Sequence, residues 1–166
     1  SVCKSVERQS LVDILRRLLL LHAKGETDSA ERPVRMSTDI YCDSDLFQRE
    51  VAQIFCKEAQ LVCFSSDLPE KGSYLCFDDL QIPIILVRDN SGNCRAFLNA
   101  CSHRNARLKE GCGKSMHLTC PFHAWRFSLE GTLESVYKRD TFGDLDPVLY
   151  DLTSLPIQEK YGLVYV

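Results

Sequence analysis

The 166-residue sequence contains no apolar run that approaches the roughly 20 residues needed to cross a bilayer. Charge of neither sign dominates, because 20 Lys and Arg residues stand against 23 Asp and Glu residues. This balance gives no support for binding of nucleic acid or for electrostatic attachment to a membrane surface. Residues 1–24 show no apolar core or cleavage signal of a secretory signal peptide, and the chain has no internal repeat or low-complexity segment.

Cysteine, in contrast, is abundant, with nine residues in the chain. An odd number of cysteines without regular spacing argues against a secreted disulfide scaffold. We therefore expect a reducing compartment, namely the cytoplasm, with an organelle stroma or matrix as the alternative.

Two short segments each combine one thiol with one imidazole. Cys101 and His103 form a C-x-H motif, and Cys120 and His123 form a C-x-x-H motif. Four such donors in two closely spaced pairs are typical of a metal centre. An extended run precedes each pair, at 94–98 and 116–119, so two strands that end side by side would bring both loops together.

Two kinds of metal centre remain open from the residues alone. Four mixed ligands can hold one tetrahedral zinc ion, or a two-iron, two-sulfide cluster with two thiolates on one iron and two imidazoles on the other. Zinc fingers usually pair Cys with Cys and His with His. Here each loop mixes the two types, which favours two irons that each take one ligand from each loop.

A longer pattern surrounds these four residues. Cys-Ser-His-Arg-Asn-Ala-Arg-Leu at 101–108, Cys-Pro-Phe-His-Ala-Trp-Arg-Phe at 120–127 and the following Gly131 resemble the Rieske domain of aromatic-ring-hydroxylating mono- and dioxygenases. The resemblance implies that Cys101 and Cys120 bind one iron of a Rieske [2Fe-2S] cluster as thiolates. It also implies that His103 and His123 bind the second iron as imidazoles.

Three positions indicate which type of Rieske domain the chain resembles. Respiratory Rieske proteins have high potentials and carry an extra Cys in each cluster loop, where this chain has Ala106 and Phe122. They also favour a hydrogen-bonding Ser where this chain has Trp125. These differences favour the oxygenase or ferredoxin type, in the lower part of a range of roughly −150 to +300 mV.

The N-terminal third of the sequence shows helical patterns. We predict a helix over 10–24, capped by Ser10 and ended by Gly25, followed by a polar linker at 25–35. A second helix is predicted over 44–60, with its buried face formed by apolar residues: Leu46, Phe47, Val51, Ile54 and Phe55. We expect a helical arm and linker at 1–43 and the Rieske domain at 44–166.

After residue 60 the hydrophobic pattern changes to the alternation typical of strands. Predicted strands lie at 61–64, 73–77, 82–88, 94–99, 125–127, 132–136 and 161–166, with a turn at 111–113. The fold class is therefore mainly β with N-terminal helices, an antiparallel Rieske-type domain with two cluster-binding loops. Cys112 and His117 do not fit the motif, and we exclude both from the metal ligands.

The resemblance covers residues 40–166 and leaves one part of the family's chemistry unaccounted for. In that family, oxygen and substrate react at a mononuclear iron held by two His and a carboxylate. Only His22 and His117 remain outside the cluster motif, so we expect no catalytic residue in this chain. We expect a fragment, a truncated product or a subunit that needs a partner.

The predicted function is one-electron transfer from a ferredoxin or flavin reductase to a mononuclear iron in another domain or a neighbouring subunit. No nucleic acid and no membrane span are expected. A stand-alone Rieske ferredoxin is one alternative, although such ferredoxins do not have the helical segment that precedes Leu61. A zinc-stabilised interaction module is the other, less favoured because each loop mixes thiol and imidazole.

Overall fold

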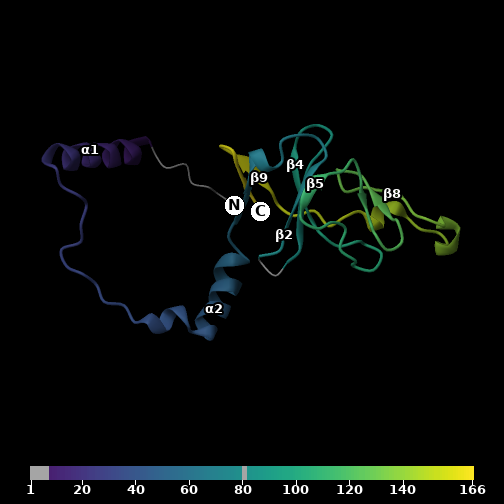
Figure 1. Ribbon diagram of the computed structural model, residues 1–166, viewed down its shortest axis with the longest axis horizontal. Helices are drawn as coiled ribbons and strands as arrows, with labels where there is room; N and C mark the ends of the chain where they lie inside the picture. Colours follow the sequence, from purple (N-terminus) through teal and green to yellow (C-terminus); the bar gives the residue numbers. More distant parts are fainter. Residues whose placement is uncertain (1–7, 80–81) are drawn as a thin grey trace. The chain divides into compact units, whose positions relative to one another are not determined.

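The computed structural model describes residues 8–79 and 82–166, and it divides into two units, Ser1–Asp43 and Ser44–Val166 (Figure 1). We describe each unit by itself. Among the described residues, no helix combines the length and the apolar character that a membrane crossing requires.

In the described part of the first unit, residues 8–43, the chain forms a long helix, α1 (Arg8–Lys24), and a short 3₁₀ helix, η1 (Thr38–Tyr41). The predicted helix is confirmed, but it begins two residues before Ser10, so the predicted Ser10 cap is wrong. Its end follows the prediction, because Gly25 has a φ of 66° and the amides of Gly25 and Glu26 donate to the carbonyls of His22 and Leu21. Residues 26–37, including the predicted linker, form neither helix nor strand.

The second unit begins with α2 (Ser44–Glu50), which continues as one turn of π-helix, η2 (Val51–Phe55). The helix therefore ends at Phe55 and does not reach residue 60. No residue of α2 or η2 is buried, and Phe47 is 50% exposed, so the predicted buried face is wrong. Periodicity predicts that a helix forms and has an apolar side, but it does not specify a surface to cover that side.

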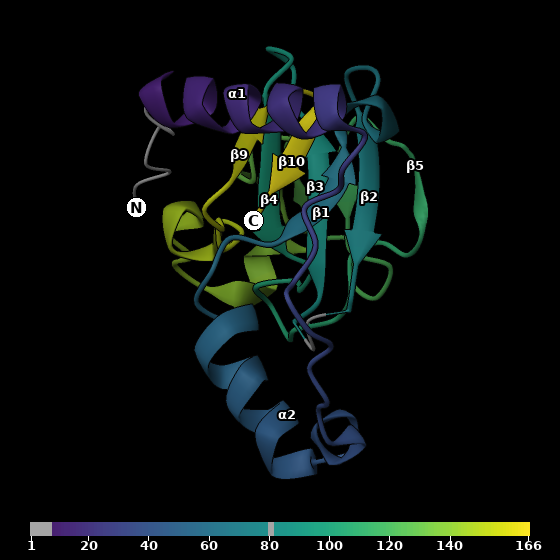
Figure 2. The same cartoon turned by 90° about the vertical axis from the view of Figure 1, so that its left-hand side faces the viewer.

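Antiparallel strands form three sheets within the described part of the second unit. β1 (Leu61–Phe64), β10 (Leu163–Tyr165) and β9 (Gln158–Lys160) pair in that order. The largest sheet has the order β4 (Cys94–Leu98), β3 (Ile84–Arg88), β2 (Ser73–Phe77) and β5 (Cys112–Lys114), visible from left to right in Figure 2. The third sheet consists of β6 (Leu118–Thr119), β7 (Arg126–Phe127) and β8 (Leu133–Ser135). The predicted antiparallel, mainly β class is confirmed.

The central strand β3 separates two hydrophobic cores. All five of its residues are buried, and successive side chains point to opposite faces of the sheet. Ile85 and Val87 belong to the core that also contains both motif cysteines, whereas Ile84 and Leu86 belong to the core beneath β1 and β10. One face of the largest sheet therefore supports the motif loops.

Two local predictions are wrong. Residues 112–114 form strand β5, which pairs with β2, although Gly111 and Gly113 predicted a turn. Gly113 serves close packing instead, because a Cβ there would lie 3.0 Å from the hydroxyl of Tyr74. The strands that precede the two motif loops, β4 and β6, belong to different sheets and do not end as neighbours in one sheet.

Gly131, the last residue of the resemblance pattern, lies in the connection between β7 and β8. Its φ is 91°, and a Cβ at this position would lie 2.5 Å from Cε1 of Phe97. Both the backbone angle and the close approach therefore require glycine. The contact ties the β7–β8 hairpin to β4, the strand that leads into the first motif loop.

Candidate metal centre

The four motif residues lie around one cavity. Cys101, His103, Cys120 and His123 line a space of about 470 Å³, together with four neighbours: Arg104, Ala106, Arg107 and Phe122. The two imidazole centroids are 4.9 Å apart, and both thiols line the same cavity. Within 8–79 and 82–166, no three His, Cys, Asp or Glu side chains are arranged around a single ion position.

The first motif loop is a short closed turn. The amide of Asn105 donates to the carbonyl of Cys101 at 2.7 Å, and the amide of Cys101 donates to the carbonyl of Ala106 at 2.8 Å. Asn105 has a φ of 56°, a left-handed conformation that Asn tolerates better than most residues. This turn places His103 two residues after the thiol, on the outward side of the loop.

The second motif loop repeats this backbone pattern. The amide of Ala124 donates to the carbonyl of Cys120 at 3.1 Å, and the amide of Cys120 donates to the carbonyl of Trp125 at 2.8 Å. Ala124 takes the left-handed conformation, with a φ of 54°. His123 follows its thiol by three residues instead of two, so equivalent loops present their imidazoles from different positions.

Burial separates the two kinds of donor. The side chains of Cys101 and Cys120 belong to the hydrophobic core and are 1% and 3% exposed. His103 is half-buried and His123 is exposed. The thiols therefore form the inner wall of the cavity and the imidazoles form its outer rim.

Burial also governs the protonation of the donors. It raises the pKa of the Cys101 thiol to about 11, against the opposing effect of hydrogen bonds from the amides of His103 and Arg104. Burial, helped by the positive charges of Arg104 and His123, lowers the pKa of His103. At neutral pH the site thus offers a neutral imidazole, and a bound metal would displace the thiol proton.

Asn99 anchors the first motif loop from inside the protein. It is 1% exposed, its Nδ2 donates to the carbonyl of Lys109 at 2.9 Å, and its Oδ1 accepts from the amides of Leu108 and Lys109 at 3.1 and 3.2 Å. Because Asn99 precedes Cys101 by two residues, one side chain joins the start and the end of the loop. Such supporting hydrogen bonds set the orientation of metal ligands.

Two further contacts hold the first loop from outside. The hydroxyl of Ser102 donates to the carbonyl of Tyr150 at 2.6 Å, and Nη1 of Arg107 lies 2.5 Å from Oδ2 of Asp78. Sequence reasoning left open that Arg107 holds an acidic partner, and it missed the contact of Ser102 and the role of Asn99. A signal existed for Asn99 alone, as a polar residue within the apolar run Phe97-Leu98-Asn99-Ala100-Cys101, whereas Tyr150 contributes a backbone atom, which any residue carries.

Trp125 supports the imidazole of His103. The indole is 1% exposed and stacks on the imidazole with a centroid distance of 4.8 Å and an interplanar angle of 6°. The indole belongs to the hydrophobic core that also contains Cys101 and Cys120. Its Nε1 is buried and has no acceptor among the residues that the structure describes. An unpaired buried donor costs about 1–3 kcal/mol.

The donor set fits a Rieske cluster. Two soft thiolates and two borderline imidazoles are the ligands that such a cluster uses. The inner pair of thiols would bind one iron, and the outer pair of imidazoles would bind the other. The assignment of Cys101, His103, Cys120 and His123 as the ligands remains a prediction. The cavity and the donor chemistry support it.

The two motif-region residues that we excluded as ligands do not line the cavity. Cys112 is exposed on β5, and Nδ1 of His117 lies 2.9 Å from Oε2 of Glu134, although not in line for a hydrogen bond. Arg126 contacts the same carboxylate at 3.3 Å. His117 therefore takes part in a charged cluster on the third sheet.

Comparisons with known proteins agree with the site. The family model described as "Rieske [2Fe-2S] domain" matches residues 58–149. The carnitine monooxygenase oxygenase subunit of Escherichia coli (strain K12) is 32% identical over 127 residues, which cover 76% of this chain and 34% of that protein. The chain thus spans about a third of the length of this relative.

Solved structures show the same fold. A quaternary ammonium Rieske monooxygenase, described with regard to carnitine oxidation and inter-subunit electron transfer, matches with a TM-score of 0.70 and 31% identity, over 76% of this chain and 35% of that chain. Naphthalene 1,2-dioxygenase with indole bound matches with a TM-score of 0.69 and 31% identity, over 76% and 29%.

Proposed function

This chain belongs to the Rieske [2Fe-2S] domain family, and we propose that it is the electron-transfer domain of a Rieske oxygenase. The observation that carries the proposal is the shared cavity, in which two buried thiols and two outer imidazoles converge from loops of equal backbone geometry. When bound, the cluster supplies reversible one-electron transfer.

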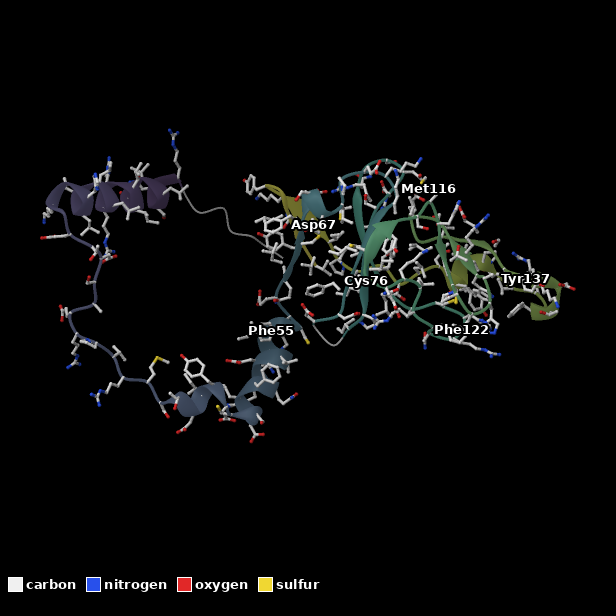
Figure 3. All side chains as sticks on the ribbon, viewed as in Figure 1. Phe55, Asp67, Cys76, Met116, Phe122 and Tyr137 are labelled. Carbon is white, nitrogen blue, oxygen red and sulfur yellow. The ribbon has the colours of Figure 1, made fainter. Side chains whose placement is uncertain are left out.

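The residues of the chain provide the environment for that chemistry. The buried side chains of Cys101 and Cys120 would hold one iron away from water, and His103 and His123 would hold the other at the surface. Electron transfer to a partner needs a short path, and the exposed imidazole of His123 provides a point that a partner can approach. Phe122 beside it is 75% exposed and shares this surface (Figure 3).

We propose that the electron acceptor is a mononuclear iron in another domain or a neighbouring subunit, and that the donor is a ferredoxin or flavin reductase. Two facts support this. The matched relatives are oxygenase subunits about three times the length of the matched region, and one is described with inter-subunit electron transfer. We also propose that the substrate is chosen outside this domain, because carnitine and naphthalene oxygenases share it.

We further propose that the protein works in a reducing compartment, such as the cytoplasm or an organelle stroma or matrix. The eight cysteines that the structure describes are all free thiols. Titration of accessible thiols in freshly lysed cells, with an alkylating reagent added at lysis, would test this. Extensive disulfide formation in the cell would contradict it.

Anaerobic purification followed by iron, zinc and acid-labile sulfide analysis tests the electron-transfer function. We expect two irons and two sulfides per chain, and an EPR signal of mixed nitrogen and sulfur ligation after dithionite reduction. The double variant Cys101→Ser/Cys120→Ser is the control and should contain neither. A colourless protein with stoichiometric zinc, which iron and sulfide cannot replace during reconstitution, would overturn the proposal in favour of a zinc module.

A further inference from the structure

Aromatic rings gather around one of the two imidazoles. Besides the stacked Trp125, His103 contacts Phe142 edge to face, at 5.4 Å and 78°. Phe142 also contacts Trp125 at 5.5 Å and 73°, and Tyr150 contacts Trp125 at 5.4 Å and 72°. We call Trp125, Phe142 and Tyr150 the aromatic clamp.

Two members of the aromatic clamp come from a segment that carries no part of the Rieske motif. Phe142 ends the short 3₁₀ helix η4 (Arg139–Phe142), and Tyr150 ends another, η5 (Pro147–Tyr150). Between them Leu145 is buried in the core, and its carbonyl accepts a hydrogen bond from Nη2 of Arg139 at 2.8 Å. This anchor fixes Phe142 against His103.

The end of the segment is fixed as well. The hydroxyl of Ser102, the residue between Cys101 and His103, donates to the carbonyl of Tyr150 at 2.6 Å. The amide of Leu152 donates to the carbonyl of Gly131 at 2.8 Å. The end of the segment is therefore bound to the first motif loop and to the β7–β8 hairpin.

The second imidazole has a different environment. His123 is exposed, and apart from His103 its ring neighbour within the described residues is Phe122, at 6.2 Å and a tilted angle of 39°. Phe122 is itself 75% exposed, so it shields His123 little. The imidazole of His103 is thus packed against aromatic rings, whereas the imidazole of His123 is open to solvent.

We propose that Phe142 is a positioning residue for His103, an inference that rests on the proposed cluster ligation. Stacking by Trp125 restrains rotation of the imidazole about χ2, which is otherwise broad, but leaves the ring free to slide in its plane. Phe142, which is nearly perpendicular to the imidazole and 37% exposed, closes that direction and covers part of the same side. Phe142 thereby fixes the orientation of one ligand and keeps its surroundings apolar, two properties that tune a metal centre.

Substitution of Phe142 separates these two effects. In Phe142→Ala both the ring contact and the apolar cover are lost, so we expect broader EPR lines from the reduced cluster and an upward shift of the reduction potential. The potential rises because the reduced cluster carries one more negative charge, which water stabilises better than an apolar surface does. Phe142→Leu keeps the cover without the ring, and should broaden the lines while shifting the potential less.

Two variants serve as controls. Phe142→Tyr keeps the ring and should retain the wild-type line width. Phe64→Ala removes an exposed phenylalanine of β1 that does not line the cavity, and should change neither line width nor potential. All signals are normalised to bound iron, and thermal unfolding is recorded in parallel.

The outcomes distinguish this inference from the proposed function. A wild-type protein without a Rieske EPR signal would overturn the function itself. A wild-type signal that is unchanged in both Phe142→Ala and Phe142→Leu, or changed equally in Phe64→Ala, would overturn the role of Phe142 and leave the function intact. If Phe142→Ala fails to fold, the EPR line widths of Phe142→Leu and Phe142→Tyr are compared instead. Equal line widths in these two variants would overturn the role of Phe142.

Discussion

The two motif loops have the same backbone and different surroundings. In each loop the cysteine carbonyl accepts from the amide four residues later, and the cysteine amide donates to the carbonyl five residues later. The fourth residue after each cysteine is left-handed in both. Yet the first loop is held by Asn99, Ser102 and Arg107, and its imidazole is enclosed by the aromatic clamp, whereas the imidazole of the second loop is exposed.

This comparison separates two requirements of the site. The thiols need equal, buried and closely spaced positions, and two copies of one turn supply them. The imidazoles face different tasks in our proposal, since one is held in place and the other is open to a partner. The difference between them therefore comes from the elements packed against the loops.

The equivalence of the two loops is tested by removing either thiol. In Cys101→Ser and in Cys120→Ser we expect iron and sulfide content to fall by more than about tenfold, because a hydroxyl is a poor replacement for a thiolate on iron. Metal analysis and visible absorption measure the loss. A variant of one loop that keeps its cluster while the other loses it would break the equivalence.

The anchor of the first loop is tested with Asn99→Ala. We expect the free energy of unfolding to fall by about 3 kcal/mol, because three hydrogen bonds are lost and buried groups at Leu108 and Lys109 lose their partner. Urea unfolding measures the change. Asn90→Ala, which removes an exposed contact with Glu130, is the matched control and should stay within about 0.5 kcal/mol of wild type; equal losses in both variants would contradict the anchoring role.

The left-handed positions of the two loops differ in residue type. Ala124 carries a strain of roughly 1–2 kcal/mol in this conformation, and Gly relieves it at an entropic cost of about 0.5–1 kcal/mol. We therefore expect Ala124→Gly to raise the free energy of unfolding by about 0.5–1 kcal/mol. Asn105 tolerates the conformation, so Asn105→Gly should not stabilise. Denaturant unfolding of both variants measures the change in the free energy of unfolding. A larger increase in Asn105→Gly than in Ala124→Gly would contradict this prediction.

The smallest expected effect concerns the ion pair that holds the first loop from outside. Both Arg107 and Asp78 are partly exposed, at 41% and 48%, and solvent-exposed pairs contribute little to stability because water and salt screen them. Asp78→Asn should therefore lower the free energy of unfolding only slightly, and the difference should shrink in high salt. A large loss that does not depend on salt would show that the pair is not an ordinary surface interaction.

The sequence was most informative where function depends on residues close together in the chain. Cys101 with His103 and Cys120 with His123 identified the candidate site, and β1 and β2 have the predicted bounds. It was least informative where packing decides. The apolar side of α2 predicted burial that the structure does not show, and Gly113 suggested a turn where close contact with Tyr74 allows a strand.

Local chemistry thus determined the donors, their spacing, the alternating strands and the antiparallel class, because these depend on neighbours within a few residues. Only the tertiary structure decided which imidazole is enclosed. Phe142 and Tyr150 reach the site through the burial of Leu145 and the bond from Ser102 to the Tyr150 carbonyl, contacts between segments far apart in the chain. No periodicity or motif encodes such contacts, since they depend on how β7, β8 and the segment after them pack on the first loop.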